Sequence, residues 1–412
     1  MNRGFKRGMA LAAVFAAVAW LIGGCSGGER AEELVPQTSC AGAKGLCVDK
    51  GTLMKDGQPY RGAGVNYFNA FSRTLLNPGD TTYRHGFEVL KEYRIPFVRF
   101  MASGYWPSEF KLYLEDQEKY FQLMDGVVKA AEDNGIGLIP SLFWYHSAVP
   151  DLVKESRDQW GNPDSKTMEF MREYIRLIVT RYKDSPAIWG WEFGNEYNLE
   201  ANLPNAAEHR PPIHPELGTA NERSAKDDMT LDMIQTAIAE FGREVRKYDP
   251  DRIILTGNSM PRPTAWNQRE TLEFKQDTEA QFEEMLVVEN PDPANVITVH
   301  YYPGDEQRFD STPNDLVMLA KLVEISNRVR KPLFIGEFGV SDAVEEGGLL
   351  DPEAAEQRFM QMVEAIGEAQ VPLSALWVYD FYGQSDNNVT SDNGRSYQLK
   401  ALTQLNEELA KF

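Results

Sequence analysis

Hydrophobic residues fall into eight short apolar runs along the chain, and each run is followed by a segment with helical spacing. The runs are nearly continuous, which is typical of strands covered on both faces. Apolar residues in 121–131 recur at the i, i+3, i+4, i+7 spacing of an amphipathic helix. The predicted strands are 60–68, 96–101, 137–145, 188–193, 252–256, 296–301, 333–338 and 373–379. The predicted helices are 87–93, 121–131, 168–182, 229–248, 276–288, 315–330, 352–369 and 397–409.

Alternation of strands and helices predicts an α/β fold with a parallel sheet. Eight repeats in about 350 residues favour a closed (β/α)8 TIM barrel over an open doubly wound sheet. Gly62-Ala63-Gly64 lacks the third glycine of a dinucleotide-binding loop, which argues against the open alternative. Residues 48–60 contain Lys50-Gly51 and Asp56-Gly57, which are typical of tight turns, and predict an N-terminal β-hairpin.

Two long polar segments interrupt the alternation, after the fourth and the eighth predicted strand. Residues 198–228 are rich in Pro, Asn and Glu, and residues 382–396 are rich in Asp, Asn, Ser and Gly. Loops that follow the strands of a barrel gather on its C-terminal face, where functional sites lie. We therefore expect both segments to border a site.

Glu196 and Glu337 each follow an apolar run, the fourth and the seventh. A lone glutamate in such a place is usually a solvated loop residue. On a parallel barrel, however, these two strand ends face each other across the mouth. Two facing carboxyl groups suit cleavage of a glycosidic bond, one as acid and the other as nucleophile or base. A separation of about 5–5.5 Å would predict a covalent intermediate and retention of configuration.

The sequence around these glutamates resembles glycoside hydrolase family 5, in clan A. Trp191–Glu196 is similar to the strand-four motif of the acid/base, and Ile335–Gly339 to the strand-seven motif of the nucleophile. Further matches follow in chain order at Tyr60–Asn66, Phe97–Phe100, His300–Pro303 and Leu376–Tyr379. The resemblance covers residues 57–412 and implies a single catalytic domain over 46–412.

The resemblance also implies roles for individual side chains. Glu196 would be the general acid/base, which needs a raised pKa, and Glu337 the nucleophile. Asn195 would bind the sugar 2-hydroxyl, and His300 would position the acid. Arg99 and Tyr302 would hold an ionised Glu337 in its orientation. Trp377 would be the surface on which the sugar stacks.

Several of these residues have a structural alternative. Arg99 could instead close the barrel as an ion pair, and Trp377 could belong to the core. Trp106, Trp144 and Trp266 follow predicted strands and could either stack on sugars or simply pack.

One position departs from the family pattern. Phe143 stands where many members carry a histidine at the end of strand three, and His146 follows three residues later. His146 could substitute for that histidine or be an unrelated loop residue. The departure favours the mannanase-like members over the cellulase-like ones.

The net charge of −20 argues against nucleic acid as a partner, because phosphates would be repelled. The five histidines are dispersed without a His-x-x-x-His pair, so we expect no metal and no cofactor. The Asp/Asn residues of 382–396 could surround a calcium ion, but a solvated turn is favoured. We expect a monomer.

The N-terminus has the organisation of an export signal. Arg3, Lys6 and Arg7 precede the apolar run 9–22, which ends in Gly23-Gly24-Cys25. This resembles a bacterial lipobox and predicts a signal peptide over 1–24, lipidation of Cys25 and a flexible linker over 25–45. An ordinary signal peptide or an uncleaved anchor are the alternatives.

Cys40 and Cys47 lie close together in the sequence of a chain expected to be exported. Two thiols make a poor metal site, whereas an oxidising compartment favours a disulfide. We therefore expect a local disulfide between them.

These observations predict an exported, lipid-anchored retaining hydrolase of β-linked polysaccharide or oligosaccharide. β-1,4-Mannan or a related hemicellulose is the preferred substrate, followed by β-glucan or cellulose. A surface glycan-binding protein that has lost catalysis and a transglycosylase are the alternatives.

Overall fold

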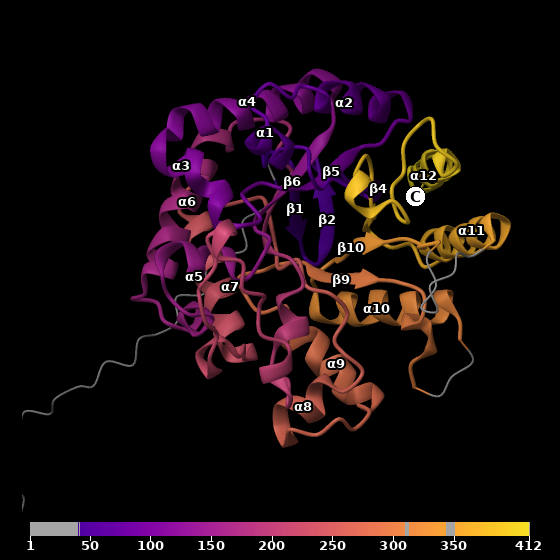
Figure 1. Cartoon of the computed structure of the whole chain (residues 1–412). Helices are drawn as coiled ribbons and strands as arrows, with labels where there is room; N and C mark the ends of the chain where they lie inside the picture. The colour runs from indigo at the N-terminus through magenta and orange to yellow at the C-terminus, as the bar shows by residue number, and fades with distance from the viewer. Residues whose placement is uncertain (1–39, 41, 310–312, 343–350, 412) are drawn as a thin grey trace, which may run out of the picture. The chain divides into compact units, whose positions relative to one another are not determined.

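The computed structural model describes residue 40 and residues 42–309, 313–342 and 351–411, which belong to one compact unit. Its centre is a sheet of eight parallel strands in the order β8-β7-β6-β5-β4-β11-β10-β9, surrounded by helices (Figure 1). The strands are β4 (Gly62–Asn66), β5 (Phe97–Met101), β6 (Gly137–Phe143), β7 (Gly190–Gly194), β8 (Ile253–Leu255), β9 (Ile297–Tyr301), β10 (Leu333–Phe338) and β11 (Leu373–Leu376).

The two ends of this strand order, β8 and β9, meet at Asn295. The Asn295 backbone N–H donates to the Ile254 carbonyl at 3.1 Å, and the Ile254 N–H donates to the Asn295 side-chain oxygen at 2.9 Å. An amide side chain thus takes the place of a ladder carbonyl at the junction. The nearly closed sheet confirms the predicted (β/α)8 barrel.

The predicted elements recur with shifted ends. The fourth strand begins at Gly190 instead of residue 188, and the eighth ends at Leu376 instead of 379. Four short helices, at Ser72–Leu76, Lys111–Glu115, Ala148–Val153 and Ala265–Thr271, escaped prediction. The helices are α1 (Ser72–Leu76), α2 (Tyr83–Glu92), α3 (Lys111–Glu115), α4 (Gln117–Asn134), α5 (Ala148–Val153), α6 (Lys166–Tyr182), α7 (Leu231–Arg246), α8 (Ala265–Thr271), α9 (Glu279–Val288), α10 (Asp315–Val329), α11 (Pro352–Glu368) and α12 (Ser396–Leu409).

A small antiparallel sheet covers the N-terminal end of the barrel. It consists of β1 (Leu46–Asp49), β2 (Thr52–Lys55) and β3 (Gln58–Pro59). Both residues of the Lys50-Gly51 turn have positive φ, as do Asp56 and Gly57, which is the geometry of tight hairpin turns. The predicted hairpin is confirmed, with a third short strand added.

Leu46 and Leu53 of this sheet pack into an apolar cluster with residues from the start of the barrel strands, including Phe97, Ile139 and Trp189. The Leu46 N–H also donates to the Trp189 carbonyl at 2.9 Å. Cys47 in β1 is joined to Cys40 by a disulfide. The N-terminal sheet is therefore part of the barrel's core.

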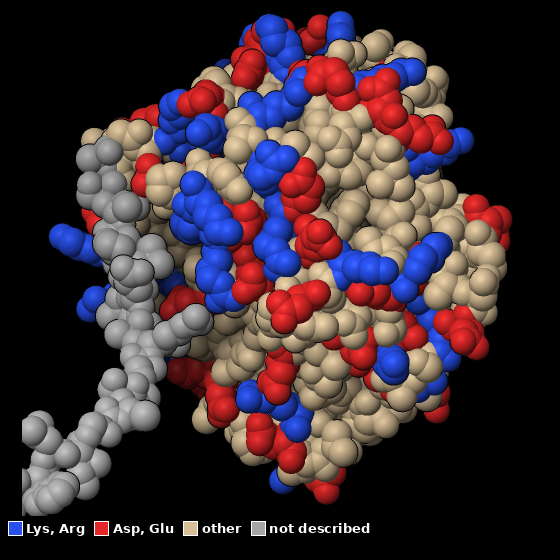
Figure 2. Space-filling view, turned by 90° about the vertical axis from the view of Figure 1, so that its left-hand side faces the viewer, with Lys and Arg blue, Asp and Glu red and all other residues tan. Residues whose placement is uncertain are grey.

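Acidic and basic side chains are interspersed on the face shown in Figure 2. The helices α4 and α6 are joined by Arg181, which donates to both carboxylate oxygens of Asp125 at 2.8 and 2.6 Å.

No helix among the residues that the structure describes is long and apolar enough to cross a membrane. The predicted signal peptide and Cys25 lie outside the described residues.

Candidate active site

A cleft of about 810 Å³ lies at the C-terminal ends of the barrel strands. Both polar insertions were expected to border a site there. The second insertion does line the cleft, through Gly383, Gln384, Asp386 and Asn387. Seven residues singled out from the sequence line it as well, namely Trp106, Trp144, Asn195, Glu196, Tyr302, Glu337 and Trp377.

Glu196 stands two residues after the end of β7, where the chain turns sharply. Its φ of +54° lies in the left-handed region of backbone conformation, which residues other than glycine rarely adopt. The Glu196 N–H donates to the Gly257 carbonyl at 2.8 Å. Gly257 has no room for a side chain, because a Cβ there would lie 1.8 Å from the Gly194 carbonyl oxygen. The close approach of the two strand ends fixes this turn.

Glu337 lies inside β10 and is held at both oxygens. Arg99 Nη1 donates to Oε1 and the Tyr302 hydroxyl donates to Oε2, each at 2.8 Å. Burial, together with the charge of Glu337, raises the pKa of Tyr302 well above its usual value, so the phenol keeps its proton. The carboxylate is therefore fixed in one orientation.

Arg99 is fully buried and serves two carboxylates. Besides Glu337, its Nε donates to Glu192 Oε1 at 2.7 Å, and its Nη2 donates to the Asn195 side-chain oxygen at 2.8 Å. Burial acts to lower the pKa of Arg99, but the charges of Glu192 and Glu337 outweigh it and raise that pKa above the usual value. Burial raises the pKa of Glu192 despite the neighbouring guanidinium. Arg99 therefore forms a buried ion pair inside the barrel and also holds Glu337.

His300 lies between the two glutamates. Its Nδ1 is 2.8 Å from Glu196 Oε1 and 3.5 Å from Glu337 Oε2. Carboxylate oxygens only accept hydrogen bonds, so Nδ1 carries the proton. One ring nitrogen of His300 and one carboxylate oxygen from each glutamate lie within 4.8 Å of one another.

The pKa of Glu196 lies below its usual value in this structure. Burial acts to raise it, but the hydrogen bond and charge of His300, with a smaller contribution from Ser259, outweigh burial. The glutamate side chain is also 32% exposed. The expectation of a raised pKa is therefore wrong for the free site, because the hydrogen bond and charge of His300 act against burial.

Aromatic rings surround the two glutamates. Trp144 and Trp377 are stacked with centroids 6.0 Å apart, and Phe68 contacts both of them. The Arg99 guanidinium lies 4.4 Å from the Trp144 ring centroid. Trp377 donates its indole N–H to Gln384 at 2.6 Å, which ties it to the second insertion. Such rings form a surface on which a sugar can stack.

Four predicted site residues do not line the cleft: Arg99 and His300 lie behind it and contact the glutamates, whereas Trp266 and His146 have other partners. Trp266 lies on α8, packs against the core and donates to Glu284 at 2.9 Å. His146 is only 12% exposed and lies beside Arg157 at 3.0 Å. Burial and the charges of Arg157 and Arg223 lower the pKa of His146 well below its usual value. His146 is therefore a neutral histidine that is largely shielded from solvent.

Sequence reasoning missed Glu192 and Asn66. Asn66 accepts from Arg99 Nη1 at 3.0 Å and donates to the Gly336 carbonyl at 2.8 Å. A signal for Glu192 existed, because a carboxylate inside an apolar strand must find a buried partner. Asn66 lies within the first predicted strand, 60–68, and its polar side chain gave the same kind of signal.

The donor set could also be considered as a metal site. Glu196, His300 and Glu337 have suitable atoms within 4.8 Å. Yet both oxygens of Glu337 already accept hydrogen bonds, Oε1 from Arg99 and Oε2 from Tyr302. The positive charge of the Arg99 guanidinium beside Oε1 would also repel a cation. The arrangement suits a pair of acids better than a metal centre.

Curated relatives of this chain are mannanases. It is 24% identical over 280 residues to a probable mannan endo-1,4-beta-mannosidase F from Neosartorya fischeri, covering 64% of this chain and 53% of that protein. It is 40% identical over 143 residues to the mannan endo-1,4-beta-mannosidase F of Aspergillus fumigatus, covering 33% of this chain and 26% of that protein. The chain spans about half, or less, of the length of these relatives.

Solved structures share the fold at low identity. The endo-1,4-beta-mannanase of Rhizomucor miehei matches with a TM-score of 0.63 and 15% identity, covering 89% of this chain and 100% of that one. The exo-beta-1,4-mannosidase Op5Man5 from an Opitutaceae bacterium matches with a TM-score of 0.58 and 16% identity, covering 88% and 63%. The profile of the family described as Cellulase (glycosyl hydrolase family 5) matches residues 55–380, which hold the facing glutamates and their partners. The chain belongs to glycosyl hydrolase family 5.

Proposed function

We propose that this protein is a retaining glycoside hydrolase that cleaves β-linked glycans, with β-1,4-mannan preferred. The facing pair Glu196 and Glu337 carries the proposal. Their closest oxygens lie within 4.8 Å, which supports the short carboxyl separation of retaining enzymes over the about 6.5–9.5 Å of inverting ones.

In the proposed reaction, Glu337 attacks the anomeric carbon while Glu196 protonates the leaving oxygen. The fixed orientation of Glu337 between Arg99 and Tyr302 supports its role as nucleophile. Glu196 then takes a proton from water, whose oxygen attacks the anomeric carbon and breaks the ester bond between Glu337 and the sugar, so that the sugar is released and Glu337 is free again. Asn195, held by Arg99, is placed to bind the 2-hydroxyl.

Glu196 must be protonated when the substrate is bound. Its side chain is partly exposed in the free site, so a sugar that covers it would remove water and raise its pKa. His300 would then accept the role of holding the acid in place. We infer that proton uptake by Glu196 accompanies substrate binding.

The mannan preference rests on the relatives and on the departure at Phe143. A panel of mannan, glucan, xylan and aryl β-glycosides tests it, with release of reducing ends as the measurement. We expect the highest kcat/KM on a β-mannan and retention of configuration by NMR of the first product. Release that is unchanged in Glu337→Ala would overturn the proposed site. Binding without release by the wild-type protein would favour a glycan-binding protein, and transfer to added acceptor sugars a transglycosylase.

We also propose that the protein is exported and anchored through a lipid on Cys25. The basic N-terminal residues and the apolar run ending in Gly23-Gly24-Cys25 support this. Mass spectrometry of the mature N-terminus should find an acylated cysteine, and Cys25→Ala should move activity from the membrane fraction. An unmodified N-terminus elsewhere in the chain would refute the anchor.

A further inference from the structure

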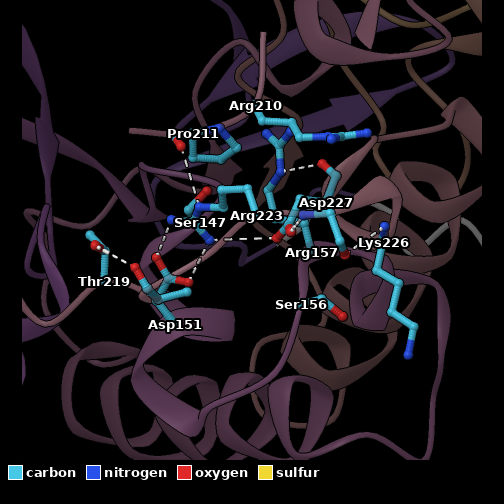
Figure 3. Close-up of polar contacts among 12 residues, drawn as sticks. Ser147, Asp151, Ser156, Arg157, Arg210, Pro211, Thr219, Arg223, Lys226 and Asp227 are labelled. Atoms are coloured by element: carbon cyan, nitrogen blue, oxygen red, sulfur yellow. Dashed lines mark hydrogen bonds and ion pairs between the residues drawn. The ribbon is translucent and has the colours of Figure 1, made fainter. Parts of the chain in front are cut away.

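The first insertion, residues 198–228, is fastened to the barrel at Arg223. Arg223 Nη1 and Nη2 donate to the two carboxylate oxygens of Asp151 in α5, both at 2.7 Å (Figure 3). The side chains are 5% and 1% exposed. A bidentate pair with so little exposure fixes geometry as well as distance.

The same guanidinium also holds the backbone of the insertion. Arg223 Nε donates to the Pro211 carbonyl and Nη2 to the Pro212 carbonyl, each at 3.3 Å. A second fastening lies beside it, where Arg157 Nε donates to the Asp227 carbonyl at 2.6 Å (Figure 3). The segment on both sides of Ile213 is therefore tied to elements that follow β6.

The fastened segment leans on the turn after β5. The ring of His214 lies edge-on to Trp106 with centroids 5.7 Å apart. Gly218 also touches this turn, since a Cβ at Gly218 would lie 3.0 Å from Pro107 Cβ. The insertion thus braces Trp106 and Pro107 from outside.

The braced turn presents partly exposed rings to the cleft. Tyr105 is stacked on Tyr145 with centroids 4.8 Å apart, and Trp106 meets both rings edge-on. Tyr105 and Trp106 line the cleft, and Glu109 accepts the Tyr105 N–H at 2.7 Å. This ring group is built separately from Trp144, Trp377 and Phe68, which contact one another.

We propose that Tyr105 and Trp106 form a distal subsite for a second part of a β-linked glycan, and that Arg223 is its positioning residue. Two ring groups in one cleft fit a substrate of several sugar units, because each group offers its own stacking surface. The proposal rests on the proposed function but concerns chain-length recognition instead of bond cleavage. Arg223 would act only by keeping the insertion, and with it Trp106, in place.

The test compares wild type, Arg223→Lys, Trp106→Ala and the double variant on β-1,4-manno-oligosaccharides from dimer to hexamer. Arg223→Lys keeps the charge but loses the fork that reaches Asp151 and the two prolines. We expect its KM for the hexamer to rise about tenfold with kcat within about twofold, and kcat/KM for the shortest hydrolysed substrate to change less than about twofold. Trp106→Ala should show the same dependence on chain length, and the double variant should lose no more than the larger single effect.

Arg181→Lys is the matched control, because Arg181 makes a similar fork with Asp125 between α4 and α6, away from the cleft. Arg181→Lys should leave KM and kcat unchanged for both the short and the long oligosaccharides. Equal losses on short and long substrates, additive effects in the double variant, or an unaffected hexamer in Trp106→Ala would each overturn the proposal. If Arg223→Lys does not fold, Trp106→Ala alone decides.

Failure of the proposed function gives a different result. If wild type hydrolyses none of the ladder, calorimetric binding of the same oligosaccharides replaces the kinetics. Affinity that rises with chain length and loses this rise in Trp106→Ala would support the subsite. Affinity independent of Trp106 would overturn it.

Discussion

The N-terminal end of the barrel is filled by Leu46 and Leu53 packed on Phe97 and Trp189, whereas the C-terminal end buries Arg99 among carboxylates. Apolar burial stabilises the first end by roughly 25 cal/mol per Å² and asks only for a good fit. Burial of charges costs free energy at the second end unless every group has a partner. The same eight strands therefore hold a stabilising end and a costly one.

The two ends of the barrel should tolerate substitution differently. Side chains at the N-terminal end contribute only to the stability of the fold, so their loss should leave the catalytic chemistry intact. Side chains at the C-terminal end are held in geometries that folding alone would not select, such as the left-handed backbone of Glu196. Variants at the two ends should separate activity from stability in opposite directions.

Glu337→Gln should give the largest effect, a fall in kcat/KM of about 10⁴-fold or more, because the nucleophile is removed. The free energy of unfolding should hold or rise, since Arg99 keeps Glu192 as a charged partner. Reducing-sugar assays and urea unfolding measure the two quantities. A strongly destabilised variant would show that the site's charges stabilise the fold after all.

Arg99→Met should cost about 3–5 kcal/mol of unfolding free energy, because Glu192 and Glu337 lose their shared cation inside the protein. Activity should fall as well, since Glu337 and Asn195 lose a hydrogen bond each. The double variant with Glu192→Gln should regain part of the stability but not the activity. Recovery of both would contradict the role of Arg99 in orienting Glu337.

Leu46→Ala should cost about 2–5 kcal/mol, the usual range for a buried leucine, with kcat/KM unchanged in the folded protein. Leu114→Ala is the matched control, because Leu114 is exposed, and it should change stability by less than about 0.5 kcal/mol. An altered KM in Leu46→Ala would mean that the two ends are coupled through the strands.

Glu289→Gln should change the pH dependence of the free energy of unfolding. Burial raises the pKa of Glu289 to about 8, although Asn198 donates to it at 2.6 Å. The folded protein therefore keeps a proton that the unfolded chain releases, so stability falls as pH rises from about 4.5 to about 8.

The Glu289→Gln variant should lose this slope, which is at most about 1.4 kcal/mol per pH unit. Urea unfolding at about pH 6 and about pH 8.5 measures it, with the surface variant Glu364→Gln as control. A slope that survives in Glu289→Gln would assign it to other groups.

The barrel and the facing glutamates could be predicted because their signals are local. Apolar runs and helical spacing repeat eight times, and an acid at the end of a buried strand stands out without a structure. The N-terminal turns were predicted for the same reason, since Lys50-Gly51 and Asp56-Gly57 need only their own backbone geometry. Strand ends could not be predicted to the residue, because the register between neighbouring strands decides where pairing stops.

Contacts between distant segments could not be predicted in this way. Trp106 and Trp266 looked equivalent in the sequence, since each follows a predicted strand, yet only Trp106 lines the cleft. His146 looked like a possible site residue, but Arg157 and the first insertion enclose it. Which side of a loop faces the cleft depends on what the loop packs against.

The sequence alone determined the (β/α)8 architecture and the two carboxylates, because strand period and strand-end chemistry are properties of short segments. Only the tertiary structure decided that Arg99 joins Glu192 to Glu337, that His300 lowers the pKa of Glu196, and that Arg223 fixes the first insertion. Each of these depends on distances between residues far apart in the chain. Hydrogen bonds and charges act over a few ångströms, and only the folded chain sets distances that small.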